Sequence, residues 1–229
     1  LGVNGVTPVA KAIHAGAALN SVTLNSNGIF GTLGRRGEPD KFVDDCDAFL
    51  TALKESNILT LSLQNTGIGP LTLRKLATSL PAAIAHLALG SNRIGDEAMI
   101  SLLDVVKDIP LISFDISETK CGVSTATKLA ELLSEETKFR ATVNLLTVDS
   151  IGDPEYNNGG PKPYTLTAGE DKIELSNKNL GPADINLISI WLATPAGAAV
   201  ARLILDENPL TGGTHPSNFD KDITGVVNL

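Results

Sequence analysis

The sequence predicts a mixed α/β fold built from repeated strand–helix units. Two observations carry this prediction. A short apolar frame recurs along the chain at nearly constant spacing. Each copy of the frame is followed by a stretch in which apolar residues recur with helical periodicity.

The frame is clearest in LALGSNRIGD, residues 87–96, where three apolar residues surround Asn92 and a glycine follows. Its last apolar position recurs at spacings of 28, 39, 26, 27, 30, 29 and 30 residues, at Leu1, Ile29, Ile68, Ile94, Cys121, Ile151, Leu180 and Leu210. The alternating residues before it predict short strands with one buried face, at 22–24, 61–63, 87–89, 114–116, 173–175 and 203–205. Cys121 stands at an inward apolar position, so we expect it in the core.

The second half of each unit has helical spacing, as in residues 69–80, 95–109, 122–139 and 181–195. Pro70 and Pro182 stand where a helix would begin, a position that does not need their missing N–H group. Trp191 falls in an apolar helical run, and we expect it to pack in the core rather than to be an exposed anchor.

Together these motifs resemble the leucine-rich repeat proteins, in the ribonuclease-inhibitor-like subtype with about 28 residues and one helix per repeat. The resemblance implies one curved, right-handed solenoid over 1–229, with parallel strands on the concave face and helices on the convex face. It also implies that the Asn or Thr that closes each strand bonds the backbone of the neighbouring repeat. These residues are Asn27, Thr66, Asn92, Thr119 and Asn208. Lys178 and an extra residue within 143–152 depart from the pattern.

Three segments interrupt the repeats: 31–42, 211–222 and the irregular stretch 149–171, which is rich in Pro, Gly and Asn. Tyr156 and Tyr164 in the last segment are candidate contacts for a protein partner. The alternative is an insertion tolerated on an exposed edge. Both ends of the sequence fall within a unit, so we expect a segment of a longer solenoid, or one whose ends are covered by other chains.

The concave face is the main candidate for binding, because residues between the strand leucines point outward. Its first rows are small and neutral, which would let a partner backbone approach closely, and they include Gln64 and the flanking His86. The later rows are acidic, so stacking would produce an acidic stripe for a basic partner. The stripe would consist of Asp115, Glu118, Glu174, Asp206 and Glu207. The alternative is that these acids only keep the protein soluble.

Composition and motifs argue against several other functions. The net charge is -8 and no Lys/Arg cluster occurs, which disfavours nucleic-acid binding. Histidines, cysteines and acids show no metal-binding spacing, and we find no phosphate loop or nucleophile elbow, so we expect no cofactor and no enzymatic activity. The longest uncharged run, 185–201, is short and contains a proline, so membrane insertion is not expected. The absence of an N-glycosylation sequon favours an intracellular, cytoplasmic protein.

The sequence therefore predicts a non-catalytic protein–protein interaction scaffold that belongs to a larger protein or assembly, eukaryotic and intracellular as the subtype implies. Two alternatives remain open at this point. One is a GTPase-activating regulator, because the subtype is similar to the domain of the Ran-activating family. The other is the ligand-sensing domain of an innate immune receptor.

Overall fold

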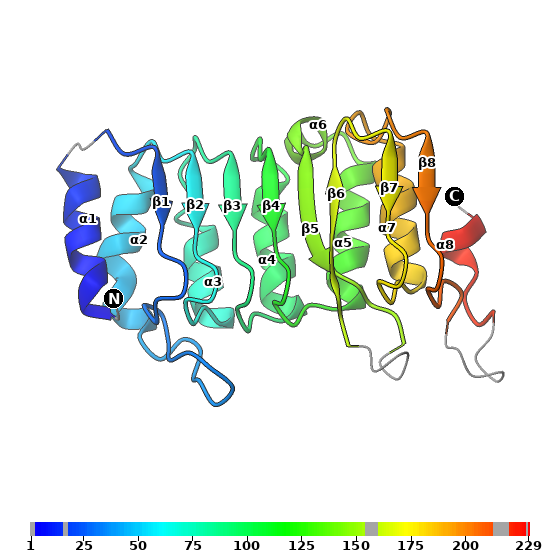
Figure 1. Ribbon diagram of the computed structural model, residues 1–229. Coiled ribbons are helices and arrows are strands. Elements are labelled where there is room, and N and C mark those ends of the chain that lie inside the picture. Colours follow the sequence, from blue (N-terminus) through cyan, green and yellow to red (C-terminus); the bar gives the residue numbers. More distant parts are fainter. Residues whose placement is uncertain (1–2, 16–17, 154–159, 213–219, 228) are drawn as a thin grey trace.

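The computed structural model shows a mixed α/β fold in which strand–helix units lie side by side (Figure 1). It describes residues 3–15, 18–153, 160–212, 220–227 and 229. Among these residues the strands form one sheet of six and a second sheet of two.

Five parallel strands begin the larger sheet, and the sixth strand joins it antiparallel to the fifth. The strands of this sheet are β1 (Ser21–Thr23), β2 (Thr60–Ser62), β3 (His86–Ala88), β4 (Ser113–Asp115), β5 (Leu145–Asp149) and β6 (Pro163–Thr167). The smaller sheet pairs β7 (Lys172–Glu174) with β8 (Arg202–Ile204) in parallel. The alternation read from the sequence therefore placed β1 to β4, β7 and β8.

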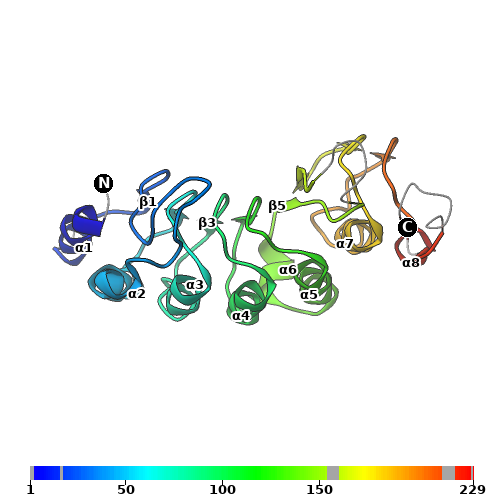
Figure 2. The ribbon, with the colours of Figure 1, turned by 90° about the horizontal axis from the view of Figure 1, so that it is seen from below.

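The helices lie on the opposite side of the molecule from the strands, along the outer side of a gently bent row (Figure 2). They are α1 (Val6–His14), α2 (Asp47–Lys54), α3 (Pro70–Ala77), α4 (Asp96–Val106), α5 (Val123–Ser134), α6 (Lys138–Thr142), α7 (Pro182–Leu192) and α8 (Thr224–Val227), with 3-10 turns η1 (Val3–Gly5) and η2 (Val43–Cys46). Pro70 and Pro182 are the first residues of α3 and α7, as predicted.

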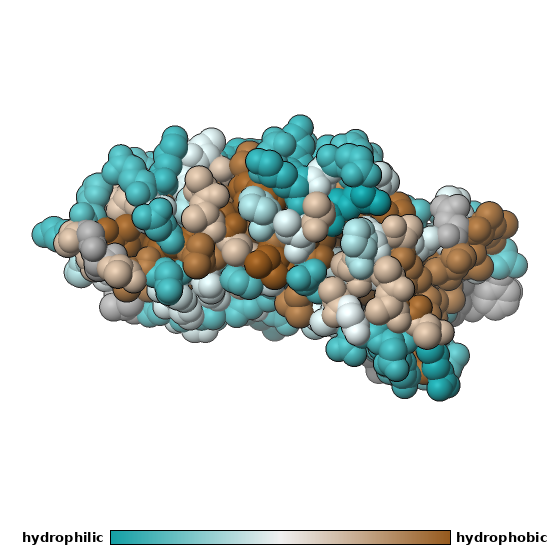
Figure 3. Space-filling model, turned by 90° about the horizontal axis from the view of Figure 1, so that it is seen from above, coloured by the Kyte–Doolittle hydropathy of each residue, from teal (hydrophilic) through white to brown (hydrophobic). Residues whose placement is uncertain are grey.

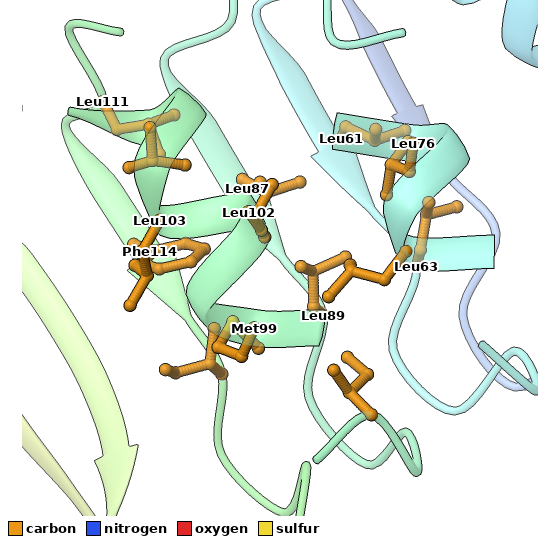
Figure 4. Packing of buried hydrophobic residues seen from close by; sticks show 14 of the residues in the cluster. Leu61, Leu63, Leu76, Leu87, Leu89, Met99, Leu102, Leu103, Leu111 and Phe114 are labelled. Atoms are coloured by element: carbon orange, nitrogen blue, oxygen red, sulfur yellow. The ribbon is translucent and has the colours of Figure 1, made fainter. Parts of the chain in front are cut away.

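The core lies between the strands and the helices, and the apolar residues of the frame fill it. Leu87, Leu89 and Ile94 are 1%, 0% and 2% exposed. Figure 4 shows the leucines of neighbouring units facing helix residues such as Met99 and Leu102. Trp191 is buried as expected, and Cys121 is only partly buried but packs against this core. One strand–helix unit cannot cover its own apolar edges, so each unit depends on its neighbours.

Asn92 links neighbouring units by hydrogen bonds. Its buried Oδ1 accepts from the N–H groups of Thr66 (3.0 Å) and Ile68 (3.1 Å) in the preceding unit. Its Nδ2 donates to the carbonyl oxygens of Leu63 (2.8 Å) and Leu89 (2.7 Å). These bonds satisfy main-chain groups that are buried where the strands end.

Asn208 repeats this arrangement, because its Oδ1 accepts from the N–H groups of Lys178 and Leu180. The prediction is wrong for Thr66 and Thr119, whose hydroxyls donate to carbonyls of their own units. A hydroxyl has one proton and a shorter reach than an amide. In these units the main-chain carbonyl of the threonine accepts from the preceding unit instead.

The segment 149–171 is more regular than the sequence predicted. Residues 163–167 form β6, which pairs antiparallel with β5 along its whole length. The alternation in PYTLT is a strand pattern, and Pro163 lies at the first strand residue, where proline is tolerated. The described residues between β5 and β7 include no helix, so α5 packs directly against α7.

Hydrophobic side chains are exposed at the C-terminal end of the row, on the right of Figure 3. They are Ile223, Val226, Val227 and Leu229, which are 40% to 72% exposed. None of the described helices is both long enough and apolar enough to cross a membrane.

Candidate functional site

One face of the larger sheet is uncovered. The helices lie behind the other face (Figure 2), although parallel sheets usually carry helices on both sides. We call this surface the open sheet face, formed by the outward residues of β1 to β6. It is mostly hydroxyl-bearing and consists of Ser21, Thr23, Thr60, Ser62, His86, Ala88, Ser113, Asp115, Leu145, Thr147, Asp149, Pro163, Thr165 and Thr167.

A chain of hydrogen bonds crosses this face at the ends of the strands. Asn25 Oδ1 accepts from Ser62 Oγ (2.8 Å) and from the Gln64 N–H (2.9 Å). Gln64 Nε2 then donates to Asp115 Oδ2 (2.6 Å), across the unit between them. The other oxygen of Asp115 accepts from the hydroxyl and the N–H of Ser117.

Gly90 allows this crossing. A Cβ atom built on it would lie 3.2 Å from Ser117 Oγ and 3.3 Å from Gln64 Nε2. The sequence suggested that this small row would leave room for a partner backbone. That interpretation is wrong at Gly90, because the Gln64 side chain occupies the space and the glycine is buried.

The predicted acidic residues do not form one stripe. Asp115 ends β4 and Glu118 follows that strand, whereas Glu174 ends β7 and Asp206 and Glu207 follow β8, the two strands of the second sheet. The β5–β6 hairpin separates the two groups, and its outward Thr147 and Thr165 bond each other at 3.0 Å. A continuous stripe required every unit to stack alike, and the antiparallel β6 breaks that stacking.

Some of these acids already have partners. Glu174 accepts from Ser176 Oγ (2.6 Å) and forms an ion pair with Lys172 (3.2 Å), and these contacts lower its pKa. Glu118 accepts from the Ser91 hydroxyl. His86, on β3, lies 2.9 Å from Ser113 Oγ, measured from Nδ1.

The insertion at 31–42 projects from the edge toward which the parallel strands point (Figure 1). Arg93, which belongs to a later unit, holds it: its guanidinium donates to the carbonyls of Gly34 (3.0 Å), Arg35 (2.7 Å) and Gly37 (3.1 Å). The base of the insertion is fixed by close contact with Gly67, where a Cβ would lie 2.6 Å from the Gly31 nitrogen. The insertion is therefore an ordered wall beside the strand ends.

This wall borders an open groove of about 410 Å³, which we call the strand-end groove. Polar residues that follow or end successive strands line it: Asn65, Ser91, Glu118 and Asp149. Three cations also line it, Arg35, Arg93 and Lys120, and Pro161 lies at its border. The sequence analysis did not find this groove, because the residues that line it, from Arg35 in the insertion to Asp149, are far apart in the sequence and come together only in the fold.

Asp149 has a structural role in the groove. In earlier units the N–H of the residue equivalent to Glu118 donates to a carbonyl of the next unit, as Ser91 does to Ser117. The hairpin removes that carbonyl, and Asp149 Oδ2 accepts from the Glu118 N–H at 2.6 Å instead. Burial, followed by the charge of Glu118, raises the pKa of Asp149.

The two tyrosines proposed as loop contacts have different outcomes. Tyr156 lies outside the described residues. Tyr164 is only 2% exposed, so its assignment as a surface contact is wrong. Its hydroxyl donates to Asp184 Oδ1 (3.1 Å), and burial raises its pKa well above the ordinary value.

Residues with catalytic or metal-binding chemistry are dispersed. In the described part of the chain, no three His, Cys, Asp or Glu side chains are grouped so that they could hold a metal ion. Asp44 and Asp47 instead pair with Lys75 at 3.4 and 2.8 Å. Cys46 and Cys121 are both free thiols, and burial raises the pKa of Cys46 to about 12.

No protein-family model matches this chain, and no curated protein is significantly similar to it.

Proposed function

We propose that this chain is a leucine-rich repeat solenoid of the ribonuclease-inhibitor-like subtype and acts as a non-catalytic scaffold for protein binding. The regular frame and the asparagine bonds between units support the solenoid assignment. The arrangement of strands along one side and helices along the other supports it as well.

The open sheet face is the observation that carries the binding function. Its main-chain groups are already paired within the sheet, so a partner would meet side chains rather than unpaired backbone. Asn25, Gln64 and Asp115 are held by hydrogen bonds before any partner arrives. Side chains that are already ordered lose little entropy on binding, which favours affinity.

Site-specific photo-crosslinking tests this proposal. A photoreactive residue replaces Thr23 or Thr165 on the open sheet face, and Thr127 on the exposed side of α5 serves as the matched control. We expect protein adducts from the two positions on the face and none from Thr127. Adducts from Thr127 alone, or from no position, would contradict the proposal.

A further inference from the structure

The strand-end groove concentrates cations in an acidic protein. Arg35, Arg93 and Lys120 line it, although the net charge of the chain is -8. Within the described residues, none of the three forms an ion pair with a carboxylate, whereas Arg74, Lys75 and Lys128 elsewhere do. Arg93 uses its guanidinium to hold neutral carbonyls, so its charge remains uncompensated there.

The groove is also bipolar along its length. The arginines lie at the side of the insertion and β3, and the carboxylates of Glu118 and Asp149 lie at the ends of β4 and β5. Lys120, two residues after Glu118, also lines the groove, and its charge acts on Asp149 and lowers the pKa of that carboxyl. Burial raises the pKa of Asp149, and the charges of Glu118 and Asp115 raise it further, whereas the Glu118 N–H bond and the charge of Lys120 lower it. A bound cation would therefore add to the partial compensation that Lys120 gives these carboxylates.

The groove is preorganised on its arginine side. Three carbonyls of the insertion bind one guanidinium, and the insertion closes on itself through the bonds of Thr32 with Glu38. The backbones of Gly31 and Gly67 lie so close that a Cβ on either residue would clash with the other. Arg35 is therefore presented from an ordered wall, which reduces the entropy lost when a ligand binds.

The spacing of the strands that carry these residues limits the ligand. Arg93 follows β3 and Asp149 ends β5, so they are two strands apart, about 10 Å at the usual 4.8 Å between strands. An extended chain advances about 3.3 Å per residue, so about three residues span this distance. We propose that the strand-end groove binds an extended peptide segment with an acidic residue against Arg35 and Arg93 and a Lys or Arg three positions away against Glu118 and Asp149.

This inference rests on the proposed scaffold function and assigns a partner chemistry to one surface. Nuclear magnetic resonance titration with short synthetic peptides tests it. One set carries an acidic residue and a lysine three positions apart, in either order, and a control set carries the same two residues adjacent to each other. We expect the spaced set, in one of its two orders, to shift the amide signals of Ser91 and Glu118 in a saturable way, and the adjacent set to bind at least about tenfold more weakly.

Charge-reversal variants identify the residues involved. Arg35→Glu and Glu118→Lys should each weaken the peptide by about tenfold. Arg36→Glu is the matched control, because Arg36 is exposed next to Arg35 and does not line the groove. Glu207→Lys is the second control, because Glu207 has the same left-handed backbone as Glu118 but lies after β8. Amide spectra of each variant verify that it is folded.

The outcomes separate the inference from the function on which it rests. Equal binding of spaced and adjacent peptides, no shift at Ser91 and Glu118, or equal losses in Arg35→Glu and Arg36→Glu would overturn the groove assignment. If crosslinking from the open sheet face captures a protein that neither groove variant affects, the scaffold function stands and the inference fails. If the peptides bind as expected but no crosslink forms from the face, the groove assignment stands and the assignment of binding to the open sheet face is wrong.

Discussion

Replacing Asp184 by Asn should stabilise the protein at neutral pH. Asp184 is fully buried where α7 meets the β5–β6 hairpin. Its Oδ2 accepts from the N–H groups of Ile151 (2.7 Å) and Gly181 (2.8 Å), and its Oδ1 accepts from the Tyr164 hydroxyl (3.1 Å). An asparagine can keep all three contacts, because its oxygen accepts from both N–H groups and its NH2 group donates to the tyrosine oxygen.

The size of the change in the free energy of unfolding follows from the pKa of Asp184. Burial outweighs the three hydrogen bonds and raises this pKa from 3.8 to about 6. A raised pKa means that the folded state holds the proton more tightly, so this stabilisation is complete below about pH 4 and is lost as the pH rises through about 6. The full shift corresponds to about 3 kcal/mol, of which about 2 kcal/mol develops between pH 4 and pH 7.

Denaturant unfolding of the wild type and Asp184→Asn at both pH values measures this effect. The difference between the two proteins removes the contribution of every other titrating group. We expect Asp184→Asn to gain about 2 kcal/mol relative to the wild type between pH 4 and pH 7. A constant difference, or one that moves in favour of the wild type, would refute the reasoning, because it would show that the hydrogen bonds outweigh burial.

Two further pairs of substitutions test the contacts between units. Asn92→Ala leaves buried N–H and carbonyl groups of two units unpaired and should lower the free energy of unfolding by about 3 kcal/mol, whereas Thr66→Val, which removes one hydroxyl bond, should lower it by about 1 kcal/mol. Equal losses in denaturant unfolding would argue against the proposed role of Asn92. Gly67→Ala places a Cβ against the Gly31 backbone, whereas Gly95→Ala at a similar φ (+78° against +81°) meets no atom within 4 Å. Hydrogen exchange at the Thr32 and Glu38 amides should therefore accelerate in Gly67→Ala alone. Acceleration in both variants would mean that the strain of an alanine at positive φ, and not the clash with Gly31, loosens the insertion.

Local sequence predicted the repeated part of this fold well. Leu87, Leu89 and Ile94 occupy the core because a short frame determines which side chains face inward, whatever lies far away in the chain. Gly95, at the end of that frame, has the positive φ that the turn into α4 requires. The direction in which such side chains point is set within one unit, whereas their burial also needs the neighbouring units.

Features that depend on contacts between distant segments were missed. The strand pattern around Tyr164 was hidden by flanking turn residues, and its pairing with β5 depends on the hairpin register. Gln64 reaches Asp115, 51 residues away, because Gly90 lies between them only in the folded molecule. The bonds from Arg93 to the insertion span 56 to 59 residues, so the groove exists only after several units have stacked.

Hydrogen–deuterium exchange of the protein with its crosslinked partner tests the scaffold assignment most directly. We expect the partner to protect amides on the strand side, over residues 60–65, 86–91 and 113–118, and to leave the exposed turns of α3, α4 and α5 unchanged. Protection confined to the helices, with no change along the strands and their ends, would contradict it.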